Sequence, residues 1–259
     1  MTVRSAIGRA RTVVLIFAVL LIGALPTVPR VEPPAGERTA GVRPAAEPRT
    51  AVPLRVMPLG ASSTEGLGSP ATAGYRVPLL AMLRRDGVAV DFVGSQRSGP
   101  ASLADRDNEG HSGWTVAMMV PRVAGWVRAA RPDVILLHAG TNDLGGGASG
   151  AVVAQRLDDL LNRIYRQAPS VHVVVAGVWA KMRSRAAARA DLAARTPGVV
   201  TRHRTLGHSI TFVDTSDLVS PSEFADGVHP NAAGYARIAR MFAREIETYL
   251  AGRRASATA

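Results

Sequence analysis

The feature that most constrains this chain is the alternation of short, almost continuously apolar runs with longer amphipathic stretches. A run that is apolar on both faces is expected for a strand of a parallel sheet that is covered on both sides. Strands that alternate with helices favour a three-layer α/β/α sandwich with right-handed crossovers and a parallel sheet of about five strands. The predicted strands span residues 54–59, 88–94, 133–138, 171–178 and 210–214.

Helical spacing and stop signals define the predicted helices. Residues 149–169 place apolar side chains on one face, one helix is expected from Thr115 to just before Pro132, and the last helix begins near Asn231. In such a fold, ligands bind beyond the carboxyl ends of the strands. The segments that follow those ends are therefore the place to look for a site.

Residues 1–53 are expected to direct export of the domain and to lie outside it. Residues 1–12 contain three arginines and no acid, and Val13–Leu25 is an uncharged run of thirteen residues. This pattern is typical of a signal peptide and is shorter than the ~20 residues of a membrane span. We expect a signal peptide or an uncleaved signal anchor over residues 1–25, and either places the rest of the chain outside the cytoplasm, secreted or tethered to a membrane.

The remaining boundaries follow from composition. Residues 26–53 are rich in Pro, Ala, Arg and Glu without apolar periodicity, so we expect a disordered linker. The globular domain is predicted over 54–250, with a flexible tail over 251–259. The formal charge of the chain is +11, but its arginines are scattered and only 5% of its 259 residues are aromatic. We therefore expect no nucleic-acid partner.

Polar residues cluster after the predicted strands. Ser62 follows the first strand, Asn142 follows the third, and Asp226 and His229 precede the last helix. Acyl transfer needs such a set, because a serine hydroxyl requires a histidine to remove its proton and the histidine requires a carboxylate on its other nitrogen. The oxyanion that forms needs donors already aimed at it, which backbone N–H groups and an amide side chain supply.

Four segments in order resemble the SGNH, or GDSL-like, hydrolases: "PLGASSTEG", "NEGHSGWT", "GTND" and "DGVHPN". The resemblance covers the whole domain, implies a flavodoxin-like fold, and is closest to carbohydrate esterases of family 3, including acetyl xylan esterases. It implies that Ser62 is the nucleophile, with His229 as its base and Asp226 as the partner of that base. It also implies an oxyanion hole formed by the N–H groups of Ser62 and Gly113 and the side chain of Asn142.

Several alternatives remain beside these assignments. Ser62 could be a turn residue, with Ser63 as a helix N-cap, and Gly110 competes with Gly113. Asp143 is interpreted as structural support. The family usually has Asp before the nucleophile, and here that position is Ala61, which leaves open a change in rate, in substrate or in neither.

Other conspicuous side chains are given structural roles. No histidine has a partner at metal-ligand spacing and the chain has no cysteine, so we expect no metal and no cofactor. Two tryptophans near strand ends are interpreted as core residues more readily than as sugar platforms. These side chains are the site-adjacent His111 and His138, the incidental His172, His203 and His208, and the tryptophans Trp114 and Trp179.

The sequence therefore predicts a monomeric serine esterase that hydrolyses short acyl esters, with acetyl on a carbohydrate as the preferred substrate. A small-molecule or polysaccharide ester is the expected partner. The alternatives are a lipid or aryl esterase, an acyltransferase to a wall polymer with the same residues, and a catalytically silent glycan-binding module.

The two interpretations of the leader predict different mature proteins. Cleavage predicts an N-terminus near Leu25 in mass spectrometry of the exported protein. An intact Met1 or Thr2 in the membrane fraction would instead identify an anchor.

Overall fold

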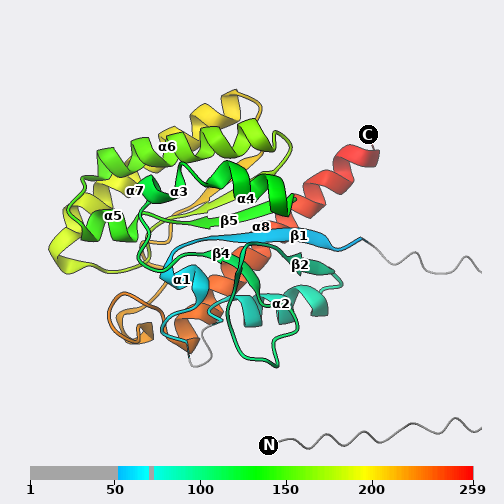
Figure 1. Cartoon of the computed structure of the whole chain (residues 1–259), viewed down its shortest axis with the longest axis horizontal. Coiled ribbons are helices and arrows are strands. Elements are labelled where there is room, and N and C mark those ends of the chain that lie inside the picture. The colour runs from blue at the N-terminus through cyan, green and yellow to red at the C-terminus, as the bar shows by residue number, and fades with distance from the viewer. Residues whose placement is uncertain (1–51, 70–72, 259) are drawn as a thin grey trace, which may run out of the picture. The chain divides into compact units, whose positions relative to one another are not determined.

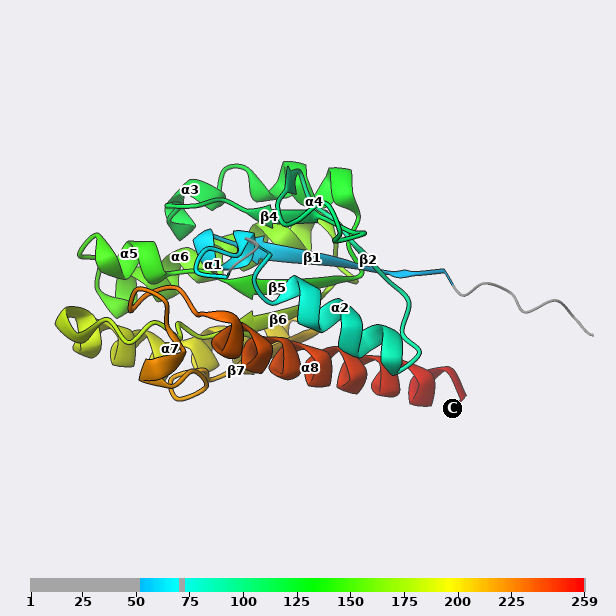
Figure 2. The same ribbon diagram turned by 90° about the horizontal axis from the view of Figure 1, so that it is seen from below.

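A seven-stranded sheet separates two helical layers (Figures 1 and 2). The structure is a computed structural model and describes residues 52–69 and 73–258. Predictions that fall on residues 1–51 lie outside this part of the chain. The strands are β1 (Leu54–Gly60), β2 (Val90–Phe92), β3 (Gln96–Arg97), β4 (Asp107–Gly110), β5 (Val134–His138), β6 (His172–Ala176) and β7 (Ile210–Val213).

The sheet is built outward from β1. Strand β1 pairs in parallel with β5, β5 with β6 and β6 with β7, whereas β4 and β2 pair in parallel with the other edge of β1. The pairing of β3 with β4 is antiparallel. The prediction of a three-layer α/β/α sandwich with a largely parallel sheet is confirmed, and all five predicted strands are present.

Two strands were not predicted, so the expectation of five strands was too low. Strand β4 occupies Asp107–Gly110, between the predicted strands 88–94 and 133–138, and β3 pairs with it. Polar residues and glycine have low strand propensity, and here pairing with the end of β1 outweighs that preference.

The helical layers have separate apolar cores. One core packs α3, α4, α6 and α7 on the sheet, and the other packs α2 and α8 on its opposite face. The helices are α1 (Ser62–Glu65), α2 (Arg76–Arg85), α3 (Val116–Met119), α4 (Val123–Ala130), α5 (Thr141–Gly145), α6 (Gly150–Gln167), α7 (Ala186–Thr205) and α8 (Ala232–Thr258), with 3-10 turns η1 (Arg183–Arg185) and η2 (Pro221–Glu223).

Two helices differ from the prediction. The single helix expected from Thr115 is interrupted near Pro121 and forms α3 and α4, because proline lacks the N–H that a continuing helix needs. Helix α8 continues to Thr258 through the segment expected to be a flexible tail. Within residues 52–69 and 73–258, no helix combines the length and the apolar character needed to cross a bilayer.

The end of β1 depends on a glycine. A Cβ added to Gly60 would lie 2.2 Å from the carbonyl oxygen of His138 and 2.4 Å from the hydroxyl of Thr64. Backbone pairing of β1 with β5 at Gly60 and His138 fixes that approach. We therefore infer that Gly60 allows the two central strands to meet at the edge where β1 leads into α1.

Gly60→Ala is expected to lower the free energy of unfolding by about 1–3 kcal/mol, because the added methyl overpacks the junction of β1 and β5. Gly125→Ala is the matched control: Gly125 lies in α4 with open space at its Cβ position. That change should raise stability by up to about 1 kcal/mol. Urea unfolding of both variants measures the difference, and equal stabilities would contradict this account of Gly60.

Candidate active site

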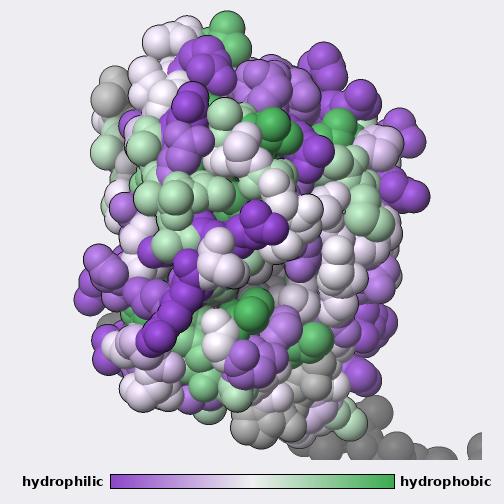
Figure 3. Space-filling view, turned by 90° about the vertical axis from the view of Figure 1, so that its left-hand side faces the viewer, coloured by the Kyte–Doolittle hydropathy of each residue, from purple (hydrophilic) through white to green (hydrophobic). Residues whose placement is uncertain are grey.

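The predicted site residues meet beyond the carboxyl ends of the central strands. Ser62 opens α1 directly after β1, and Asn142 lies in α5 directly after β5. His229 and Asp226 lie in the loop between η2 and α8. Figure 3 views this end of the molecule, where hydrophilic and hydrophobic residues are interleaved on the surface.

Three side chains form a continuous hydrogen-bonded series. The Nε2 atom of His229 lies 2.8 Å from the Oγ of Ser62, and its Nδ1 atom lies 2.6 Å from Oδ2 of Asp226. Ser62 and His229 are separated by 167 positions in the sequence, so the fold creates this contact. A hydroxyl, an imidazole and a carboxylate in this order can remove a proton from the hydroxyl and stabilise the resulting imidazolium.

Asp226 is held in its ionised form. Desolvation opposes this, but hydrogen bonds from the backbone N–H and ring of His229 and from the N–H of Val228 outweigh it and lower the pKa of Asp226 to about 2. Its Oδ1 atom accepts those two backbone N–H groups, at 2.8 Å from His229 and 3.0 Å from Val228. The carboxylate is thus oriented by the same turn that carries the imidazole.

The loop that carries His229 is fixed at both ends. The N–H of Ala225 donates to the carbonyl of His229 at 2.8 Å, and Phe224 forms an isolated bridge with Pro230. Asn231 caps α8, accepting the N–H of Ala233 at 3.0 Å. These contacts restrict movement of the His229 imidazole away from Ser62.

A glycine in the loop after α1 also packs against His229. Gly68 has a φ of +85°, and a Cβ there would lie 2.8 Å from the Cβ of His229. The hydroxyl of Tyr235 donates to the carbonyl of Leu67 at 2.5 Å and ties this loop to α8. Sequence reasoning missed Gly68 and Tyr235, which lie just beyond the segments 58–66 and 226–231.

The candidate oxyanion donors differ in how freely they can donate. The N–H of Gly110 donates to Oδ1 of Asn108 at 2.9 Å, and a Cβ on Gly110 would lie 2.5 Å from the backbone nitrogen of Glu65. The exposed Gly113, with a φ of +79°, has no N–H partner among the described residues. The geometry therefore favours Gly113 over Gly110 as a donor to a ligand.

Asn142 joins two of these loops. Its Nδ2 atom donates to the carbonyl of Trp114 at 2.8 Å, which uses one of the two amide hydrogens and leaves the other for a ligand. The N–H of Ser62 is at the first position of α1, where no intrahelical acceptor exists. All three predicted donors thus retain an N–H that the described residues leave available.

Asp143 holds the loops that carry Gly113 and Asn142 in place. Its buried carboxylate accepts the N–H of Val116 at 2.8 Å and pairs with Arg156 of α6 at 2.8 Å. The contact ties α5 to the start of α3 and so fixes the loop that contains Gly113. The structural interpretation of Asp143 agrees with these contacts, whereas Arg156 was not anticipated.

A buried glutamate, Glu109, also holds the loop that contains His111 and Gly113. Glu109 accepts the N–H of Ser95 at 2.7 Å and lies 2.6 Å from Nε2 of His111. The His111 ring stacks between Trp114 and Trp126 at centroid distances of 4.4 and 4.6 Å. No signal in the sequence indicated that Glu109 is buried and holds this loop, because the residues of β4 have weak strand propensity.

The neighbours of Ser62 are buried. Ala61 is 8% exposed and belongs to the apolar core, and Ser63 is 6% exposed. The N-terminal cap position of α1 is occupied by Ala61, so Ser63 is not an N-cap. A carboxylate in place of Ala61 would enter an apolar environment and would need a partner there.

The remaining histidines and tryptophans lie in the interior or in local pairs. Trp179 is fully buried and stacks on the buried His138 at 3.3 Å, whereas Trp114 is half-buried. His172 lies 2.8 Å from the hydroxyl of Ser209, and His203 lies 3.0 Å from His208. In the described part of the chain, no group of three or more His, Asp or Glu is placed to hold a metal ion.

Comparisons with known proteins agree with this geometry. Residues 59–237 match the model of the GDSL-like Lipase/Acylhydrolase family. A family 3 carbohydrate esterase of Clostridium thermocellum is 33% identical with a TM-score of 0.68, covering 74% of this chain and 94% of that chain. An acetyl esterase variant crystallised with acetate is 26% identical with a TM-score of 0.66, covering 77% and 99%.

A curated relative is much longer than this chain. The multidomain esterase of Ruminococcus flavefaciens is 25% identical over 271 residues, which cover 91% of this chain and 32% of that protein. The chain therefore spans about a third of the length of this relative.

The ion pair of Asp143 and Arg156 predicts a stability effect. Arg156→Ala should lower the free energy of unfolding by roughly 3 kcal/mol, because it leaves a buried carboxylate unpaired. Arg163→Ala removes an exposed arginine from the same helix and should change stability by less than about 0.5 kcal/mol. Denaturant unfolding compares the two.

The double variant Arg156→Ala/Asp143→Asn tests the cause. It should recover part of the loss, since it removes the buried charge as well as its partner. A double variant that loses as much as the sum of the two single variants would argue against the pairing.

Proposed function

The chain belongs to the GDSL-like lipase/acylhydrolase family. We propose that it is a serine carboxylic ester hydrolase in which Ser62 is the nucleophile, His229 the general base and Asp226 the partner of that base. The observation that carries the proposal is the series of contacts of 2.8 and 2.6 Å that joins the three side chains. Ser62 Oγ attacks the acyl carbon while Nε2 of His229 takes its proton. The Nδ1–H of the imidazolium then donates to Asp226.

The two halves of the reaction use the same imidazole. His229 returns the proton to the departing alkoxide, which leaves as an alcohol, and the acyl group remains bonded to Ser62 as an ester. A water molecule then gives a proton to His229 and attacks the acyl carbon. His229 returns that proton to Ser62 Oγ as the bond between this oxygen and the acyl carbon breaks, which releases the carboxylic acid and restores Ser62. The N–H groups of Ser62 and Gly113 and the free amide hydrogen of Asn142 hold the oxyanion in both halves.

We also propose that the substrate is a short acyl ester, preferably acetyl, on a carbohydrate. The family 3 carbohydrate esterase and the acetyl esterase among the similar structures support this class of substrate. The expected export of the chain, secreted or tethered, fits a polymeric substrate outside the cytoplasm. Small residues around the nucleophile suit a site without a long acyl channel.

Ser62→Ala should lower the rate of p-nitrophenyl acetate hydrolysis by at least about 1,000-fold, because it removes the nucleophile. Ser63→Ala is the matched control, since it removes the neighbouring buried hydroxyl and should keep most of the activity. Asn142→Ala should cost about 100- to 1,000-fold in kcat through the lost oxyanion donor. Equal rates for the natural chain and Ser62→Ala would favour a silent binding module.

The substrate class is tested by acetate release from acetylated xylan, acetylated chitin oligomers and short lipid esters. Acetylated carbohydrates should give the highest kcat/KM. A preference for lipid or aryl esters, or transfer of the acyl group to an added sugar in place of water, would replace the carbohydrate esterase proposal while leaving the assignment of Ser62 intact.

A further inference from the structure

Arginines are concentrated at the end of the molecule opposite the candidate site. Each helix of a parallel α/β fold runs antiparallel to the strands, so helix C-termini and strand N-termini share one end (Figures 1 and 2). Eight exposed arginines lie in or next to the closing turns of these helices, and we name this set the basic pole: Arg84, Arg85, Arg128, Arg131, Arg166, Arg204, Arg253 and Arg254.

Few acids balance the basic pole. Within the described part of the chain, Arg85 is the one member in an ion pair, with Asp86 at 2.9 Å. Asp133, in the loop before β5, adds one negative charge at this end and accepts the backbone N–H of Arg55 at 2.9 Å. Excess positive charge therefore remains on this end, whereas the opposite end presents both signs, such as Asp217 with Lys181.

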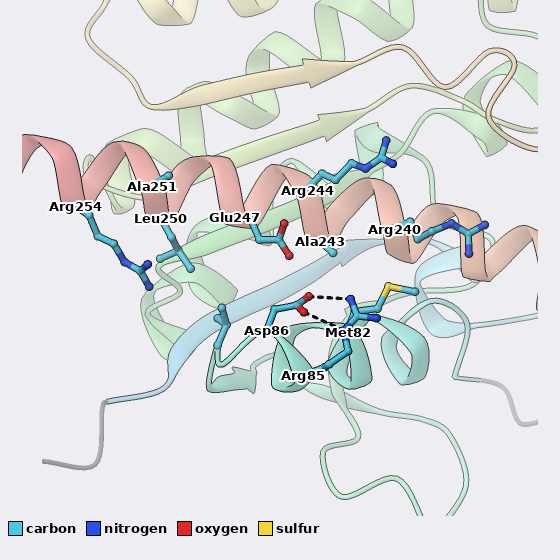
Figure 4. A pocket seen from close by; sticks show the side chains of 11 residues that line it. Met82, Arg85, Asp86, Arg240, Ala243, Arg244, Glu247, Leu250, Ala251 and Arg254 are labelled. Atoms are coloured by element: carbon cyan, nitrogen blue, oxygen red, sulfur yellow. Dashed lines mark hydrogen bonds and ion pairs between the residues drawn. The ribbon is translucent and has the colours of Figure 1, made fainter. Parts of the chain in front are cut away.

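The groove between α2 and α8 borders the basic pole and carries charges of both signs, with four arginines and two acids in its lining. Figure 4 shows Asp86 and Glu247 facing one another across the middle of this groove, with Arg85 bonded to Asp86. Arg254 lies at the far end of the groove, near the end of α8. Because the unbalanced arginines are spread over an end of the molecule, they suit an extended anionic surface better than one small anion.

The helix macrodipole explains only part of this distribution. Cations in a last helical turn stabilise the C-terminal end of the dipole, which accounts for residues such as Arg128 and Arg166. Arg131 lies beyond the last turn of α4 with a φ of +44°, in the left-handed region that favours glycine. An arginine at this strained position keeps a charge on the basic pole at a cost to the fold.

The chain enters the domain at the same end. Val52, which is 90% exposed, lies two residues before β1, and Leu206, which is 66% exposed, lies in the loop between α7 and β7. Residues 1–51 precede this point and include the uncharged run Val13–Leu25. The described domain therefore begins at the end that carries the basic pole, and the candidate site lies at its opposite end.

We propose that the basic pole docks on the anionic phospholipid surface of a membrane, through arginine contacts with lipid phosphates. Clustered basic residues near an apolar membrane segment bind anionic leaflets in this way, and the attraction weakens as salt screens it. The docked domain presents Ser62 away from the bilayer, towards substrates beyond it. Docking is independent of ester hydrolysis, so the two proposals fail separately.

The test uses the full chain, which contains no cysteine, so one engineered thiol can carry a fluorophore. Ser170→Cys places the label in the loop between α6 and β6, next to the basic pole, and Ser184→Cys places it in η1 at the opposite end. Acrylamide quenching then reports exposure of each label on vesicles of phosphatidylcholine with or without phosphatidylglycerol. We expect the label at position 170, but not the label at position 184, to be protected from acrylamide. This protection should occur only on vesicles that contain phosphatidylglycerol, and it should be lost at high salt.

Charge variants identify the surface. Arg128→Ala/Arg131→Gly/Arg166→Ala should reduce docking on the order of 100-fold, at about five-fold per arginine, and keep p-nitrophenyl acetate hydrolysis unchanged. Arg183→Ala/Arg195→Ala/Arg240→Ala removes the same total charge elsewhere and should reduce docking far less. Because glycine suits the backbone at position 131, weaker docking by Arg131→Gly alone is not explained by misfolding.

Three results would overturn the proposal. The first is protection at position 170 that is equal on neutral and anionic vesicles or absent from both. The second is an equal effect of the two triple variants. The third is equal protection by a soluble polyphosphate, which would assign the basic pole to an anionic polymer.

Discussion

The parallel pairing of β1 with β5 is the constraint on which the rest of this structure depends. The two strands share a register that ends at Gly60 and His138, and the missing side chain of Gly60 lets their backbones meet there. One strand therefore leads straight into Ser62 and its neighbour into Asn142. A single backbone contact in the middle of the sheet thus sets the distance between two loops that the proposed chemistry needs together.

The loops around this junction hold one another in place. Asp143 joins α5 to α3, Asn142 joins α5 to the Trp114 carbonyl, and Asp226 binds the backbone of the turn that carries His229. Each contact uses a polar group whose partner is a backbone atom. Such contacts orient donors before a substrate arrives, which is the condition under which an oxyanion hole is effective.

The fold class could be predicted because the buried parallel strands are largely apolar, and polar residues follow their ends. The roles of the candidate site residues came from the resemblance of four segments to the SGNH hydrolases. The supporting contacts could not be predicted in the same way. Strand β4 is formed by polar residues that adopt extended structure only through pairing with β1, and Arg156 reaches Asp143 from a helix whose pattern reveals only its apolar face. Continuation of α8 beyond Leu250 was missed because composition was read as a tail, although alanine and arginine favour a helix.

The same topology separates the two ends of the molecule, with loops of varied chemistry at one end and arginine-bearing helix ends at the other. The assignment of Ser62 as the nucleophile is tested most directly by reaction with diethyl p-nitrophenyl phosphate, followed by peptide mass spectrometry. The account predicts one diethylphosphoryl group on the peptide containing Ser62, formed in step with the loss of esterase activity and blocked in His229→Ala. A modified residue other than Ser62, or full activity in a chain modified at Ser62, would contradict it.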